Sequence, residues 1–137
     1  MKTINNKNRF SIRAEIRKVD LLGKDLFRLR FFAPEICMTA RPGQFLFIRV
    51  SDESYMPFLR RAFAVSAVFP KTGEIDIIFR KVGIGTEILG RAVCGSLIDI
   101  IGPLGNSFTI PGVGKKALVV AGGCGIASLF FLCKRLK

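Results

Sequence analysis

Apolar and polar residues alternate over residues 10–19 and 27–31, as in strands that turn one face to a core and the other to water. Residues 10–19 (FSIRAEIRKV) show the alternation clearly. Turns rich in Gly and Pro, and a polar loop over 51–56, separate the runs. We expect six strands, at residues 10–19, 27–31, 44–50, 61–68, 74–82 and 97–101. Together with a short helix over 87–92 capped by Thr86, they predict a small antiparallel barrel.

The pattern changes after the segment 111–116. Residues 117–121 are all apolar, residues 122–125 read Gly-Gly-Cys-Gly, and residues 126–137 resemble a helix with a basic end. An apolar run of this kind is typical of a parallel strand buried on both faces, and the order strand, glycine turn, helix opens a nucleotide-binding α/β domain. We therefore divide the chain into domains 1–112 and 113–137. The second is only a first βα unit, because a lone parallel strand has no neighbour to pair with.

A membrane span is the alternative interpretation of residues 117–133, which carry no charge and are flanked by lysine and arginine. Their length is the short limit for crossing a bilayer. The central glycines and the lack of aromatic residues that anchor spans at the interface favour the α/β interpretation instead.

The composition excludes several kinds of catalytic site and metal site. The chain has 137 residues, of which 50% are hydrophobic, so it can build a core. It has no histidine, which excludes histidine-based acid–base catalysis and histidine-ligated zinc, and none of its four cysteines forms a C-x-x-C pair. With no apolar secretory signal in the first residues, we expect reduced thiols and a cytoplasmic protein.

The net charge of +12 favours anionic partners such as nucleic acid, anionic lipid or a phosphate-bearing cofactor. No nucleic-acid-binding signature is present, and the basic residues alternate along strands as a solvated face would, so we expect neither nucleic acid nor membrane as a partner. A non-catalytic basic module that binds nucleic acid or an acidic partner remains the alternative function. A yellow protein would support a flavin, whereas a colourless protein that shifts DNA in a gel would support this alternative.

Two segments carry candidate binding chemistry. Arg60 and Arg61 stand at the start of an apolar strand, and a guanidinium grips phosphate oxygens in a bidentate way. The turn 83–86 (Gly-Ile-Gly-Thr) offers small residues and free N–H groups at a helix start, which suit a diphosphate. The arginines could instead belong to a solvated strand end, and the turn 83–86 could be an ordinary connection between a strand and a helix. Phe63 could stack on a flat ring or pack in the core.

Taken in order, these motifs resemble the ferredoxin reductase-like flavoproteins, and among them the electron-transfer subunits of class B, NAD-linked dihydroorotate dehydrogenases. The matching segments are PGQF at 42–45, RRAFAV at 60–65, IFR at 78–80, GIGT at 83–86, Asp99, GPLGNSF at 102–108 and VAGGCGIA at 120–127. The resemblance implies a six-stranded Greek-key barrel that binds FAD, followed by an incomplete α/β domain for NAD.

By this resemblance the cofactor-binding residues are Arg61, Ala62, Phe63, Ala64, Ile78, Phe79, Arg80, Gly85 and Thr86. Arg61 would contact the FAD diphosphate, and Phe63 the flavin or ribityl chain. Ala62 and Ala64 stand where the family has Pro and Ser. The absence of the serine hydroxyl at Ala64 would weaken the binding of the flavin or retune its chemistry. Gly122 and Gly123 match the start of a nicotinamide site that is largely missing here, and no cysteine has the spacing of the family's [2Fe–2S] ligands.

We therefore expect an FAD-binding subunit that passes electrons between NADH and an iron–sulfur cluster of a partner dehydrogenase, as in pyrimidine biosynthesis. We expect no catalytic side chain and no metal ligand, because the chemistry belongs to the flavin. The chain alone is expected to be incomplete for turnover. Arg61→Ala should weaken FAD retention more than Arg30→Ala.

Overall fold

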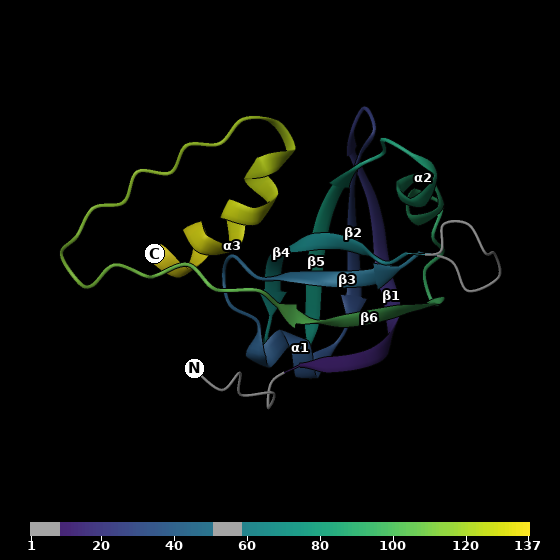
Figure 1. The fold of residues 1–137 in the computed structure, drawn as a ribbon, viewed down its shortest axis with the longest axis horizontal. Helices are drawn as coiled ribbons and strands as arrows, with labels where there is room; N and C mark the ends of the chain where they lie inside the picture. Colours follow the sequence, from purple (N-terminus) through teal and green to yellow (C-terminus); the bar gives the residue numbers. More distant parts are fainter. Residues whose placement is uncertain (1–8, 51–58) are drawn as a thin grey trace.

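Six antiparallel strands form most of the molecule in the computed structural model, which describes residues 9–50 and 59–137. They follow the order β1-β2-β5-β4-β3-β6 around a closed barrel, with β6 pairing back to β1 (Figure 1). Their bounds are β1 (Phe10–Gly23), β2 (Leu26–Phe32), β3 (Phe45–Arg49), β4 (Arg61–Phe69), β5 (Glu74–Arg80) and β6 (Leu97–Leu104). The predicted mainly β fold with a six-stranded Greek-key barrel is confirmed. The polar loop expected over 51–56 lies outside the described residues.

The barrel interior follows from the alternation in the sequence. Leu29 and Phe31 of β2 pair in register with Ile77 and Ile75 of β5, and all four side chains are fully buried. Every second residue of a strand points to the same face, so a matched register places the apolar faces of both strands inward. Burying such side chains stabilises the fold by about 1.5–3 kcal/mol each.

Two short helices add apolar side chains to this core. α1 (Pro34–Thr39) was not predicted; it starts with Pro34 in its first turn, where a missing N–H costs nothing, and buries Ile36 and Cys37. α2 (Ile84–Gly90) contributes Leu89 to the core. The helix expected over 87–92 therefore exists, but it begins three residues earlier, with Gly83 rather than Thr86 at its N-cap position.

The chain beyond the barrel differs from the prediction. Residues 117–121, expected to form a buried strand, have no regular secondary structure, and Leu118 is 91% exposed. The physical reason is pairing: the barrel is closed, so it offers no strand edge, and no further strand is present among the described residues. In Figure 1 the chain between β6 and α3 runs out from the barrel and back, and the short 3₁₀ helix η2 (Gly123–Gly125) lies just before α3.

α3 (Ile126–Leu136) follows that turn, so the helix predicted at the end of the chain is confirmed. It lies against β4 and buries Ala127 and Phe131 (Figure 1). The Lys134 ammonium lies over the Phe69 ring of β4, 5.1 Å from its centroid. No helix in the described ranges is both long enough and apolar enough to cross a membrane.

Candidate functional site

Arg61 and Gly85, far apart in the sequence, meet where β4 begins and α2 starts. A Cβ atom placed on Gly85 would lie 3.0 Å from Arg61 Nε and 3.5 Å from Arg61 Cζ. The guanidinium therefore rests directly on the backbone of the turn, at a distance that only glycine allows without displacing it. The two motifs that the sequence singled out for phosphate binding form one corner of the molecule.

The two neighbouring arginines have different surroundings. Arg60 is bound to Asp99 of β6, with Nη2 2.6 Å from the carboxylate and Nη1 3.2 Å from the backbone carbonyl. Arg61 donates to the carbonyl of Leu59, and no carboxylate of the described residues lies within ion-pair distance of it. Arg60 therefore ties the start of β4 to β6, whereas Arg61 has no carboxylate partner among the described residues.

Thr86 organises the turn itself. Its hydroxyl accepts hydrogen bonds from the N–H groups of Val82 and Gly83, at 3.0 and 3.1 Å, and donates to the Gly83 carbonyl at 3.0 Å. The N–H groups of the first helical turn, that of Gly85 included, have no partner within the helix. The hydroxyl holds the loop in place, and the first backbone N–H groups of α2 begin beside Arg61.

Phe63 and Phe79 belong to the core. Their rings meet edge to face with centroids 5.6 Å apart, and Phe79 also stacks on Phe27 at 5.7 Å. Phe63 is 8% exposed and Phe79 5%. The core interpretation of Phe63 therefore describes its packing, while a contact of either ring with a coenzyme stays a prediction.

The remaining predicted site residues lie along the same part of the sheet. On β4, Ala62 is exposed and Ala64 half-buried, and they pair with Phe47 and Phe45 of β3. On β5, Ile78 is half-buried and Arg80 exposed. Because β4 and β5 are antiparallel, the start of β4 and the end of β5 reach the same edge, so Arg80 ends on the side where Arg61 begins.

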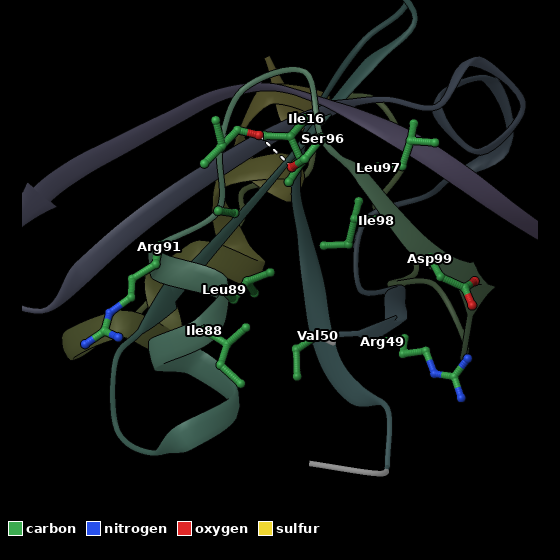
Figure 2. A pocket seen from close by; sticks show the side chains of 12 residues that line it. Ile16, Arg49, Val50, Ile88, Leu89, Arg91, Ser96, Leu97, Ile98 and Asp99 are labelled. Atoms are coloured by element: carbon green, nitrogen blue, oxygen red, sulfur yellow. Dashed lines mark hydrogen bonds between the residues drawn. The ribbon is translucent and has the colours of Figure 1, made fainter. Parts of the chain in front are cut away.

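A cavity of about 490 Å³ opens beside α2. Figure 2 shows Ile88 and Leu89 of α2 across from Ile98 and Asp99 of β6, with Val50 between them. Two of its charged groups are already engaged, since Asp99 binds Arg60 and Arg91 binds Glu87 at 2.7 Å. This cavity gathers no set of free polar groups for a ligand.

A second cavity, of about 240 Å³, lies between the barrel and α3. Ser66 of β4, which the sequence reasoning did not single out, lines it and is completely buried. A polar residue within the otherwise apolar run 62–68 was the signal that could have found it.

Neither a metal site nor a reactive thiol emerges. In the described part of the chain, no three His, Cys, Asp or Glu residues come together as a metal would require. Cys37 is buried, and burial raises the pKa of its thiol, which keeps it protonated. Cys94, Cys124 and Cys133 are exposed and unpaired in disulfides.

The curated proteins that resemble this chain in sequence carry the same description. The electron-transfer subunit of dihydroorotate dehydrogenase B (NAD(+)) from Desulforamulus reducens is 39% identical over 123 residues, which cover 90% of this chain and 47% of that protein. The corresponding subunit from a Geobacillus species is 34% identical, over 84% of this chain and 45% of the relative. This chain thus spans about half the length of the curated relatives it matches.

Solved structures agree on the fold. The structure of an NADH-dependent reduced ferredoxin-NADP oxidoreductase superposes with a TM-score of 0.81 at 34% identity, over 90% of this chain and 43% of that one. The ferredoxin reductase of carbazole 1,9a-dioxygenase superposes with a TM-score of 0.78 over 93% of this chain and 39% of that one, at 24% identity. Residues 13–108 match the oxidoreductase FAD-binding domain family. Because this match spans the barrel from its first strand to beyond its last, the chain belongs to the oxidoreductase FAD-binding domain family.

Proposed function

We propose that this chain binds FAD and carries electrons within an NAD-linked oxidoreductase of the dihydroorotate dehydrogenase B type. The observation that carries the proposal is the Arg61 guanidinium that rests on the backbone of Gly85 and has no carboxylate partner among the described residues. A diphosphate is bound by cations and by backbone N–H groups at the start of a helix, and Arg61 lies beside the first residues of α2. The residues present therefore fit the coenzyme.

The predicted site residues have different roles in FAD binding. Arg61 and the Gly85 backbone hold the diphosphate, Thr86 fixes the turn, and Arg80 adds a second exposed cation at the same edge. Ala62 and Ala64 leave the outer face of β4 flat enough for an extended chain to lie on it. Phe63 and Phe79 support that face from within.

Bound FAD supplies the exchange of electron pairs and of single electrons, so no side chain of this chain has to react. The partners we propose are NADH as donor and the iron–sulfur cluster of a catalytic dehydrogenase subunit as acceptor, in pyrimidine biosynthesis in the cytoplasm. The names of the curated relatives support this assignment. We place the FAD-binding domain at 1–112 and the start of the NAD-binding domain at 113–137, where α3 forms and residues 117–121 have no regular secondary structure.

The test compares Arg61→Ala with Arg41→Ala in the full chain, with FAD affinity measured by titration of the visible spectrum. Arg41 is exposed and is not part of the corner, whereas Arg30 is an unsuitable comparison because it holds the buried Asp76 with two hydrogen bonds. Losing one charged hydrogen bond of about 1.5 kcal/mol should weaken FAD binding about tenfold in Arg61→Ala. Arg41→Ala should bind like the parent chain, and equal loss in both variants would refute the assignment of Arg61.

A further inference from the structure

α3 rests on the barrel along one stripe of its surface. Ala127 and Phe131, four residues apart, are 5% and 3% exposed, and Lys134 follows one turn later on the same side of the helix. At the start of the helix this stripe borders the 240 Å³ cavity, which is lined there by Ile126, Ala127 and Phe130. Atoms that face a cavity lack neighbours to pack against, so the second half of α3 contributes most to its placement on β4.

The Lys134 ammonium joins that half of the helix to the barrel. Its Nζ lies 5.1 Å from the centroid of the Phe69 ring, on β4, and 4.9 Å from the centroid of the Phe130 ring, on its own helix. Residues 100–137 contain no aspartate or glutamate, and no carboxylate of the described residues lies within ion-pair distance of Lys134. Because the face of an aromatic ring attracts a cation, the two rings hold this ammonium between helix and barrel.

Phe69 is a fixed point for this contact. The Arg30 guanidinium lies over the same ring, 4.0 Å from its centroid, and donates to Asp76 at 2.7 and 2.8 Å. Glu74 stands 4.0 Å from the same guanidinium. Since two carboxylates balance the charge of Arg30, the ring can take a second cation. The contact of Lys134 with Phe69 therefore links α3 to β2 and β5 as well as to β4.

The glycine turn 122–125 moves with α3, because hydrogen bonds tie it to the first turn of the helix. The Ile126 N–H donates to the carbonyls of Gly123 and Cys124. The Ser128 hydroxyl donates to the Gly125 carbonyl at 2.9 Å. The position of α3 on the barrel thus sets the position of the turn.

We propose that Lys134 is a positioning residue: its ammonium, held against Phe69, docks α3 on the barrel and so fixes the turn 122–125 relative to β4. The functional weight of this contact rests on the proposed function, in which the turn begins the nicotinamide site. The docking itself needs no coenzyme, since every group in it belongs to the chain.

The experiment follows backbone hydrogen–deuterium exchange in the full chain without FAD, resolved into peptides by mass spectrometry. In Lys134→Gln, the amides of α3 and of the turn 122–125 should exchange about twofold to fivefold faster than in the parent chain, because the helix undocks more often. Amides of the barrel strands should keep the parent rates. Gln and Lys have similar helix propensities, so the substitution leaves the helix itself nearly unchanged.

Two matched variants separate the ring contact from other effects of the charge. Lys134→Arg keeps a cation that stacks on aromatic rings, so it should restore the parent rates to within about twofold. Arg135→Gln removes the neighbouring cation, which lies in the same last turn but contacts no aromatic ring of the described residues, and it should exchange like the parent chain. Equal acceleration in Lys134→Gln and Arg135→Gln would assign the effect to the helix end and refute the proposal.

Phe69→Leu tests the other side of the contact. It should speed exchange in α3 as Lys134→Gln does, and adding Lys134→Gln to it should have little further effect. Additive acceleration in the double variant, or parent rates in Lys134→Gln alone, would overturn the positioning role and leave the proposed function standing. A parent chain that binds no FAD in the spectral titration would instead overturn the proposed function, whatever the exchange rates.

Discussion

Individual side chains decide how much of the large positive charge is free. Arg28 binds Asp20, and Arg30 binds Asp76, whose side chain is only 4% exposed. The Arg30 guanidinium also lies over the Phe69 ring, 4.0 Å from the centroid, and its hydrogen bonds with Asp76 raise its pKa. These cations hold strands together, so the count of basic residues overstates what a ligand would meet. Arg61, by contrast, has no carboxylate partner among the described residues.

Asp20 makes the stability of the barrel sensitive to acid. Hydrogen bonds from Arg28, then from Lys18, hold the pKa of this carboxyl below its ordinary value of 3.8. A carboxyl with a depressed pKa stabilises the folded state above its unfolded pKa, and the contribution disappears as pH falls through the folded one. We expect parent-chain stability to fall more steeply than that of Asp20→Asn between roughly pH 4 and pH 2.

Urea unfolding at several pH values measures this difference. Asp25→Asn, which removes an exposed carboxylate from the turn after β1, serves as the control and should keep the parent slope. The assignment to Asp20 would be wrong if Asp20→Asn lost stability as steeply as the parent chain.

At the scale of single elements, a substitution in α2 is expected to weaken FAD binding without lowering the stability of the fold. Gly85 lies in the helix, where alanine is favoured by about 0.8–1.0 kcal/mol, so Gly85→Ala should leave the melting temperature unchanged or raise it. Its new Cβ would stand 3.0 Å from Arg61 Nε and push the guanidinium away. We therefore expect Gly85→Ala to weaken FAD binding severalfold, measured by the same spectral titration.

A double-mutant cycle controls for other effects of that substitution. If Gly85→Ala acts by displacing Arg61, it should have little further effect in a chain that already carries Arg61→Ala. Additive losses in the double variant would show that the methyl group interferes with FAD by another route.

Sequence patterns predicted most elements but not their ends. Alternation located the first two strands, and apolar runs bounded by turns located the other four. β6 was expected to end before Gly102, yet it continues to Leu104, which pairs with Phe45 of β3. α1 has only six residues, too few for a helical period to show. The cap of α2 was misplaced, since Thr86 serves the loop before the helix rather than starting it.

The whole molecule is a closed barrel with an exposed extension. All barrel strands have partners on both sides, whereas Lys115 and Lys116 lie in exposed backbone without regular structure. Exposed segments of this kind are the preferred sites of proteolysis. We expect limited trypsin treatment to cut after Lys115 or Lys116 before it cuts within any barrel strand.

Mass spectrometry of the early fragments identifies the first cut, and circular dichroism follows the barrel. The β-sheet signal should persist after cleavage at Lys116. An earlier cut within any of the six barrel strands would contradict the division of the molecule into a barrel and an extension.

By itself, the sequence determined the strands, the inward faces and the pairing of an arginine motif with a glycine turn, because these follow from local periodicity and from residue types that phosphate requires. Only the tertiary structure decided that Asp99 binds Arg60 while no described carboxylate pairs with Arg61, and that the buried Ser66 hydroxyl has no hydrogen-bond partner among the described residues. It also decided that residues 117–121 form no strand. Charge pairing, burial and strand pairing all depend on segments distant in the sequence, so no local pattern can encode them.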